Sequence, residues 1–239
     1  MDQPRRELLS LLCAKLGYNF NSWELLHIAL RHKSYVHEHP EDQAGSNERL
    51  EFLGDAVLEL CITQMLYERF PQAPEGQLSK ARSSLVNENR LAATARRLEL
   101  GSYLLVGRGE ETQNGRDKPS LLADALEAVL AAVYLDGGLE SVHRLIVDLL
   151  GPAAAAAMTR TRQKDYKTRL QELIQEKMHI TPRYEIIKTQ GPDHAKIFKV
   201  ALTINDRPLA QGTGNSKKEA EQNAAQAGLE KYEATGELF

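Results

Sequence analysis

Three carboxylates lie close together in the segment 47–58, which reads N-E-R-L-E-F-L-G-D-A-V-L. Glu48, Glu51 and Asp55 follow one another at intervals of three and four residues, and this spacing places them along one stripe of a helix. Like charges on one stripe repel one another, and the apolar residues between them leave the helix little surface for water. A divalent metal ion would neutralise the three acids. The alternative is an acidic helix face exposed to solvent.

A second pair of acids lies about seventy residues further on, in the run 120–135, S-L-L-A-D-A-L-E-A-V-L-A-A-V-Y-L. This run is apolar almost all round, as a central helix would be, and Asp124 and Glu127 are its charged residues. Their spacing of three residues puts both on one face. Buried charges are costly unless they are neutralised, so a shared metal site is favoured over acids bound to backbone amides. Carboxylates from both helices would offer the hard oxygen ligands that Mg²⁺ and Mn²⁺ prefer.

The two acidic segments resemble those of bacterial ribonuclease III. The run 47–58 matches that family's defining motif at every position, and three further stretches match in family order: P-E-G-Q-L-S at 74–79, G-R-G-E-E at 107–111 and L-A-D-A-L-E-A at 122–128. The resemblance implies an inner metal shell and two supporting or substrate-side acids. The metal shell is Glu51, Asp55, Asp124 and Glu127, of which Asp55 and Glu127 are the catalytic residues; the supporting acids are Glu48 and Glu75.

Hydrolysis of a phosphodiester needs an activated water, neutralised phosphate oxygens and a stabilised leaving 3′-oxygen, and two divalent ions can supply all three. The resemblance adds the substrate and the products. It implies cleavage of both strands of double-stranded RNA, with 5′-phosphate and 3′-hydroxyl ends and short 3′ overhangs, in the processing of ribosomal and other RNA precursors. It also implies Mg²⁺ as cofactor, with Mn²⁺ able to substitute, and a homodimer in which the ring of Phe52 inserts into the partner.

Helical periodicity runs through residues 1–158, which predicts an all-α N-terminal domain that carries the acids. The expected helices are 7–16, 22–30, 48–70, 77–100, 120–135 and 139–158. The glycine-rich, charged stretch 107–119 indicates a loop. Residues 159–163 are polar, follow an alanine run and are expected to form a short linker. The second domain then spans 164–239.

In the second domain the pattern changes from helical to β-type and back, which predicts a small α+β domain in the order α-β-β-β-α. Apolar residues recur at helical spacing in 166–178, and strands are expected at 183–189, 196–204 and 209–213. Ser216 and Glu219 have the spacing of a capping box and predict the start of the last helix.

This order resembles a double-stranded RNA-binding domain, together with G-P-D-H at 191–194 and K-K-E-A at 217–220. Lys217 and Lys218 oppose the helix dipole in a first helical turn, and a bound phosphate would resolve that conflict. The alternative is a solvated basic turn. The resemblance implies that two minor grooves are contacted by the first helix and by the loop between the first two strands. The residues it assigns to those contacts are Thr168, Gln171, Glu172 and His194.

Composition is consistent with a nuclease of this kind, although the formal net charge of −3 is unusual for a protein that binds RNA. Residues 164–239 contain 12 basic and 11 acidic residues, so the acidic excess lies in the first domain. Bound divalent cations would offset it there. Cys13 and Cys61 lie in leucine-rich helical patterns, which favours reduced thiols and a cytoplasmic protein. No long apolar run is free of charge, so no membrane span is expected.

Two other functions remain open on the sequence alone. The first is a double-stranded RNA-binding regulator whose helical domain has lost catalysis and serves only for dimerisation. The second is another metal-dependent hydrolase that uses clustered carboxylates on helices to act on nucleotides, which would leave the second domain without a purpose. A duplex RNA offered with and without Mg²⁺ separates all three.

Overall fold

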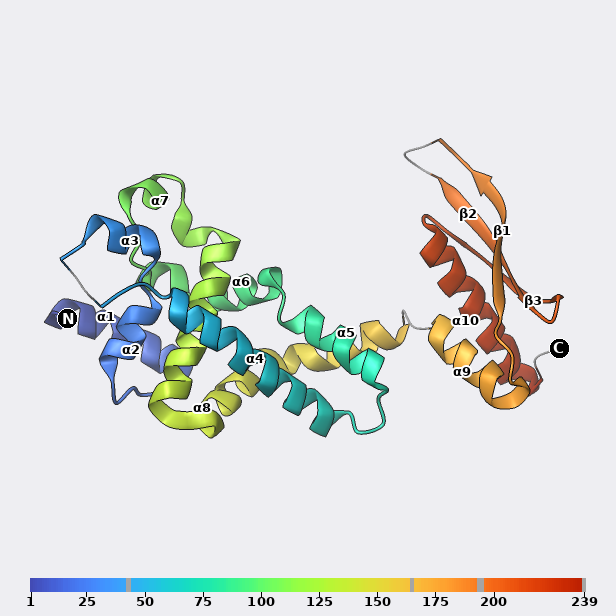
Figure 1. The fold of residues 1–239 in the computed structure, drawn as a ribbon, viewed down its shortest axis with the longest axis horizontal. Coiled ribbons are helices and arrows are strands. Elements are labelled where there is room, and N and C mark those ends of the chain that lie inside the picture. Colours follow the sequence, from blue (N-terminus) through green and yellow to red (C-terminus); the bar gives the residue numbers. More distant parts are fainter. Residues whose placement is uncertain (42–43, 164–165, 193–195, 238–239) are drawn as a thin grey trace. The chain divides into compact units, whose positions relative to one another are not determined.

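The computed structural model describes residues 1–41, 44–163, 166–192 and 196–237 (Figure 1). The chain forms two compact units, Met1–Met158 and Thr159–Phe239. The first unit is helical and the second combines helices with a three-stranded sheet, which confirms the predicted fold class. The elements in chain order are α1 (Gln3–Leu16), α2 (Trp23–Ala29), α3 (Lys33–Glu38), α4 (Glu48–Arg69), α5 (Glu75–Leu85), α6 (Glu88–Arg97), η1 (Leu100–Tyr103), α7 (Arg108–Thr112), η2 (Gly115–Asp117), α8 (Pro119–Gln163), α9 (Tyr166–Met178), β1 (Arg183–Gln190), β2 (Ile197–Ile204), β3 (Arg207–Gly214) and α10 (Lys217–Thr235).

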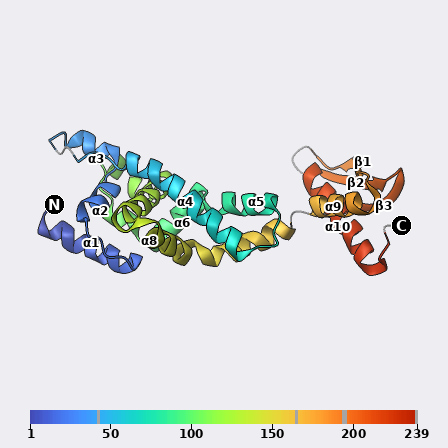
Figure 2. The ribbon, with the colours of Figure 1, turned by 60° about the horizontal axis from the view of Figure 1, so that its bottom comes forward.

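The first half of α8 is the centre of the helical unit. Small and branched apolar residues fill it, and Ala125, Leu126, Ala128 and Val129 are fully buried. Helix α4 lies against it (Figures 1 and 2) and buries Leu58, among others, in the same core. The prediction that a central, buried helix carries Asp124 and Glu127 is therefore confirmed.

The prediction of one continuous helix over 77–100 is wrong, because the helix is interrupted at Asn87. The Asn87 side chain accepts a hydrogen bond from the backbone N–H of Arg90 at 3.0 Å and donates to the carbonyl of Ser84 at 2.8 Å. Asparagine is a preferred N-cap residue, so it ends α5 and begins α6. The stretch 107–119 is also more regular than a loop, since it contains α7 and η2.

Helix α8 is interrupted at Gly138, where φ is 77° and ψ is 179°. This left-handed φ suits glycine, and it separates the two helices that the sequence predicted at 120–135 and 139–158. Residues 159–163, predicted as a linker, continue the helix to Gln163. The alanines of 153–157 are strong helix formers, and the polar residues that follow them are compatible with a helix.

In the second unit the strands pair in the order β1-β2-β3, all antiparallel, and α9 and α10 share one core with the sheet. Leu170 and Ile174 of α9 meet Val200 and Leu202 of β2 in that core. Glycine lets α10 approach β3 closely, because a Cβ at Gly212 would lie 2.1 Å from the backbone nitrogen of Ala224. The predicted α-β-β-β-α order is confirmed.

The start of α10 is capped as the sequence predicts. The Ser216 hydroxyl accepts a hydrogen bond from the backbone N–H of Glu219 at 3.1 Å, and the Glu219 carboxylate accepts one from the backbone N–H of Asn215 at 2.8 Å. The carboxylate thus reaches one residue beyond the N-cap of a standard capping box. Among the helices of the described residues, none combines the length and the apolar character needed to cross a membrane.

Candidate active site

Helices α4 and α8 approach one another closely at Gly54. A Cβ built on Gly54 would lie 1.9 Å from the backbone oxygen of Glu127 and 2.4 Å from its carbonyl carbon. The lack of a side chain at Gly54 therefore allows the backbones of the two acid-bearing helices to touch. Glu51 and Asp55 stand one turn before and directly after this glycine on α4, so the crossing brings them beside the acids of α8.

Three carboxylates meet at this crossing. Oxygen atoms of Glu51, Asp124 and Glu127 all lie within 4.8 Å of one another, and each of the three side chains is partly buried. We call this group the acid cluster. Asp55 is exposed and stands outside the cluster, although its charge acts on Glu127. The structure therefore brings together three of the four acids that the sequence places in the metal shell, with the fourth at their edge.

The carboxyl groups of the acid cluster raise one another's pKa values. Burial first, and then the charges of Asp55, Asp124 and Glu51, together raise the pKa of the Glu127 carboxyl to about 8. Burial also raises the pKa of Glu51, with Asp124 as the next cause. Partly buried oxygen donors that repel one another in this way fit a hard divalent cation, which would supply the missing positive charge.

Asp124 responds to a neighbour that the sequence did not single out. Burial raises the pKa of its carboxyl, and the largest charge contribution in the same direction comes from Glu88, the first residue of α6. Glu88 directly follows Asn87, the N-cap residue at which α6 begins.

A pocket of about 190 Å³ opens beside the acid cluster. It is lined by His32, Lys33, Asn47, Glu48, Glu51 and Asp124. Glu48 belongs to this pocket rather than to the cluster: one carboxylate oxygen accepts a hydrogen bond from the Ser46 hydroxyl at 3.0 Å, and the other lies 3.3 Å from Nζ of Lys33. The Ser46 hydrogen bond and the Lys33 ammonium lower the pKa of Glu48, so its carboxylate stays charged.

Glu75 and Phe52 lie apart from the acid cluster. Glu75 is the first residue of α5, is exposed, and accepts a hydrogen bond from the Ser79 hydroxyl at 2.8 Å. Phe52 is 82% exposed on α4, between the positions of Glu51 and Asp55 but on another face. In a single chain neither side chain contributes to the cluster, and their predicted roles in substrate binding and dimerisation stay predictions.

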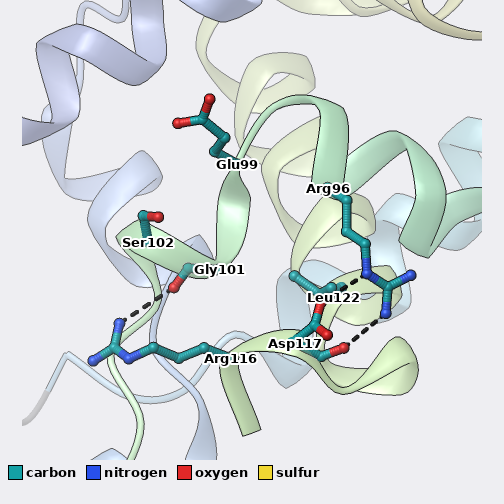
Figure 3. A pocket seen from close by; sticks show the side chains of 7 residues that line it. All are labelled: Arg96, Glu99, Gly101, Ser102, Arg116, Asp117 and Leu122. Carbon is teal, nitrogen blue, oxygen red and sulfur yellow. Dashed lines mark hydrogen bonds and ion pairs between the residues drawn. The ribbon is translucent and has the colours of Figure 1, made fainter. Parts of the chain in front are cut away.

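A second pocket, of about 280 Å³, lies where the chain enters α8 (Figure 3). Its arginines bind backbone and carboxylate oxygens there: Arg96 donates from Nε to Oδ1 of Asp117 at 2.8 Å and from Nη2 to the Asp117 carbonyl at 2.7 Å. Arg116 donates to the carbonyl of Gly101 at 3.2 Å and to the Glu111 carboxylate at 2.7 Å. These bonds hold η2 in place, and we infer that this pocket supports the start of α8 and hence the position of Asp124.

The predicted RNA-binding residues lie on the second unit, apart from His194, which falls outside the described residues. Thr168, Gln171 and Glu172 line one hollow on α9 together with Gln175, Glu176 and His179. Lys217 and Lys218 are exposed in the first turn of α10. The three α9 residues are thus brought together on one face, as the spacings of three and four residues from Thr168 to Gln171 and Glu172 predict.

Sequence reasoning missed three residues beside the acids, namely His32, Lys33 and Glu88. His32 is the N-cap of α3 and Lys33 is its first residue; this six-residue helix has no buried residues, so its sequence has no apolar periodicity that would mark it. The signal that could have identified Glu88 was its position directly after Asn87, an asparagine suited to be an N-cap.

Comparisons with known proteins agree with this arrangement. Residues 22–153 match the sequence model of a family described as ribonuclease-III-like, and residues 166–232 match that of the double-stranded RNA binding motif. Ribonuclease 3 of Borreliella afzelii is 45% identical over 229 residues, which span 96% of this chain and 93% of that protein. Ribonuclease 3 of Syntrophobacter fumaroxidans is 49% identical over 219 residues, 90% of each chain.

A solved structure resembles the helical unit. The nuclease domain of ribonuclease III from Campylobacter jejuni is 41% identical, covers 60% of this chain and 96% of its own, and superposes with a TM-score of 0.56. The sequence matches extend through both units, and the acidic motif lies within the matched part of the first. The chain therefore belongs to the ribonuclease III family, and it is an enzyme with the nuclease domain and the double-stranded RNA-binding domain of that family.

Proposed function

We propose that this protein cleaves both strands of double-stranded RNA by metal-dependent hydrolysis of the phosphodiester and leaves 5′-phosphate and 3′-hydroxyl ends with short 3′ overhangs. The observation that carries the proposal is the acid cluster at the crossing of α4 and α8, where three carboxylates lie within 4.8 Å. A double-stranded RNA-binding motif in the same chain supplies the substrate class. Precursors of ribosomal and other RNAs in the cytoplasm are the substrates that we expect, and the two buried free cysteines suit that reducing compartment.

Glu51, Asp124 and Glu127 would hold Mg²⁺, or Mn²⁺ in its place, with Asp55 as the fourth acid. Divalent ions held there would supply the activation of water and the positive charge needed at the phosphate oxygens and the leaving 3′-oxygen. The protein's own contribution is to orient the acids by packing their helices at Gly54 and to keep Glu127 partly buried. Glu48, on the open side of the pocket, and Glu75 are assigned to the substrate side.

A duplex RNA labelled on each strand in turn tests the proposal. In Mg²⁺ we expect both strands to be cut a few nucleotides out of register, and in excess chelator we expect binding without cleavage. The new 5′ ends should accept label only after phosphatase treatment, which identifies a 5′-phosphate. Binding without cleavage in Mg²⁺ would instead favour an inactive RNA-binding regulator, and indifference to the duplex would refute both readings.

Helices α9 and α10 are the proposed RNA-binding surface of the second unit. Thr168, Gln171 and Glu172 would contact the minor groove, and Lys217 and Lys218 would contact phosphates across the major groove. The free backbone N–H groups of the first turn of α10 favour an anion at the same place. His194 is proposed as the loop contact to the second minor groove.

The lysine pair yields a prediction about salt. Lys217→Ala with Lys218→Ala should weaken duplex binding about equally for unrelated sequences and flatten the slope of log K against log salt by about two units, because phosphate contacts release counterions but do not read bases. Filter binding at several salt concentrations measures the slope. The matched control is Lys231→Ala, which removes a charge near the other end of α10. A slope unchanged by the double substitution would place the phosphate contact elsewhere.

We also propose that the protein is a homodimer through α4. Phe52, Leu60 and Tyr67 are 82%, 53% and 72% exposed, and their spacings of eight and seven residues are close to two helical turns, so they form an apolar stripe. The published description of the C. jejuni nuclease domain refers to a region involved in dimer formation. Two copies would also place one acid cluster opposite each strand of a duplex.

Phe52→Ala tests the dimer. The parent should show twice the chain mass of 26.7 kDa by light scattering at micromolar concentration, and Phe52→Ala should shift the population towards the monomer, because a large exposed ring is the natural anchor of such an interface. Leu11→Ala is the control, since Leu11 is 58% exposed on α1. A monomeric parent would contradict the dimer, and a variant that stays dimeric would remove Phe52 as its anchor.

A further inference from the structure

Lys33 is the permanent cation that lines the pocket beside the acid cluster. Of the six residues lining this pocket, three are acidic, one is an amide and two are basic. Burial lowers the pKa of His32, which favours the neutral form of its ring. Lys33 shares the lining of this pocket with Glu48, Glu51 and Asp124, and its charge opposes the rise in the pKa of the last two.

The backbone around Lys33 is fixed on three sides. The N–H of His32 donates to the carbonyl of Leu105 at 2.9 Å, and the N–H of Asn47 donates to the carbonyl of Arg31 at 2.9 Å. The Ser34 hydroxyl accepts a hydrogen bond from the N–H of Gly107 at 2.9 Å. These bonds tie the start of α3 to the start of α4 and to the start of α7. The lysine is thus held at the pocket, while its side chain, 57% exposed, can still move.

Glu48 completes the arrangement. Its carboxylate is held by the Ser46 hydroxyl at 3.0 Å and lies 3.3 Å from Nζ of Lys33, so it tethers the ammonium at the mouth of the pocket. This contact explains why Glu48, which shares a helix stripe with Glu51, lies outside the acid cluster. A single exposed ion pair of this kind is weak in water. Another cation can therefore displace the Lys33 ammonium.

We propose that Lys33 is the resident counter-cation of the acid cluster in the metal-free enzyme, and that a divalent ion binds in competition with its ammonium. The inference rests on the proposed metal site. Its physical content is that the pocket carries a positive charge of its own, which partly neutralises the carboxylates and repels an incoming cation. Lys33 would thereby make divalent binding weaker and more responsive to the bulk concentration of the metal than the carboxylates alone would dictate.

Mn²⁺ binding to the full-length protein tests this inference, with free Mn²⁺ measured by electron paramagnetic resonance. Lys33→Met removes the charge but keeps a flexible side chain of similar length, and should tighten Mn²⁺ binding roughly tenfold, as expected for one unit charge a few ångströms from a divalent ion in water. Lys33→Arg keeps the charge and should stay within about twofold of the parent. Lys231→Met removes the same charge from the second unit and should change nothing.

The outcomes separate Lys33 from the metal site itself. Tighter binding in Lys33→Met alone, lost again when Glu127→Gln is added, supports the inference. Equal or weaker binding in Lys33→Met overturns it, as does equal tightening in Lys231→Met, which would indicate an effect of net charge. If Glu127→Gln does not reduce Mn²⁺ binding relative to the parent, the proposed metal site is refuted, and so is the inference. Since Lys33 is exposed, the variant should fold, and an unchanged far-ultraviolet circular dichroism spectrum would verify this.

Discussion

Replacing Glu127 by glutamine is expected to lower cleavage of duplex RNA by orders of magnitude while duplex binding stays within a few-fold of the parent. Glutamine keeps the size and the hydrogen-bonding capacity of the side chain, but it removes a negative charge from the acid cluster and is a far poorer ligand for a divalent ion. Binding depends mainly on the second unit, which the substitution leaves intact. Mn²⁺, which tolerates altered ligands more readily than Mg²⁺, should restore at most part of the activity.

Cleavage rates under single-turnover conditions, measured beside duplex affinity, check this prediction. Glu140→Gln is the matched control, because Glu140 lies on α8 beyond the interruption at Gly138, with its side chain 90% exposed and in an ion pair with Arg144. Asp55→Asn should behave like Glu127→Gln, and Glu48→Gln more mildly, because Glu48 lies outside the cluster. A Glu127→Gln protein that cut the duplex at the parent rate in Mg²⁺ would refute the metal assignment.

Replacing Gly54 by alanine is expected to destabilise the helical unit and to separate the acids. The new Cβ would lie 1.9 Å from the backbone oxygen of Glu127, and no rotamer can relieve an overlap between a Cβ and a backbone atom. The helices must move apart, which we expect to cost about 3 kcal/mol of the free energy of unfolding, at the upper end of the usual range for overpacking. Cleavage should fall as well, because Glu51 moves away from Glu127.

Urea unfolding followed by circular dichroism measures the first effect, and the cleavage rate measures the second. Gly76→Ala is the control: Gly76 lies in α5 and a Cβ there would meet no heavy atom within 4 Å. Alanine favours a helix over glycine, so this control should be stabilised by roughly 0.5–1 kcal/mol. Equal stability of Gly54→Ala and the parent would mean that the two helices do not cross as closely as described.

The acids that form the cluster could be predicted from sequence because each pair obeys helical spacing within its own segment. The contact between α4 and α8 had to be inferred separately. Both the repulsion between the unpaired carboxylates and the family resemblance favoured it. The close approach at Gly54 makes physical sense of a glycine in the middle of a helix, where it would otherwise cost stability. The second unit was also predictable, since alternating apolar residues in β2 and the Ser216 cap mark its elements directly.

The surroundings of the cluster were not predictable, because they depend on turns. Asn87 breaks a run whose apolar periodicity continues across it, and the charge of the next residue, Glu88, acts on Asp124. Lys33 is placed at the pocket by hydrogen bonds of its neighbours Arg31, His32 and Ser34 to residues 16 and 73 positions away, and the sequence pattern does not reveal such bonds. Periodicity reports which face of a helix is buried and is silent about which neighbour covers it.

Diffraction from crystals soaked in Mn²⁺, recorded at a wavelength where manganese scatters anomalously, tests the central claim most directly. An anomalous peak within coordination distance of carboxylate oxygens of Glu51, Asp124 and Glu127, absent from crystals of the Glu127→Gln protein, is the predicted result. A map without a peak at the crossing of α4 and α8, at Mn²⁺ concentrations that support cleavage of duplex RNA, would contradict the assignment of the acid cluster as the metal centre.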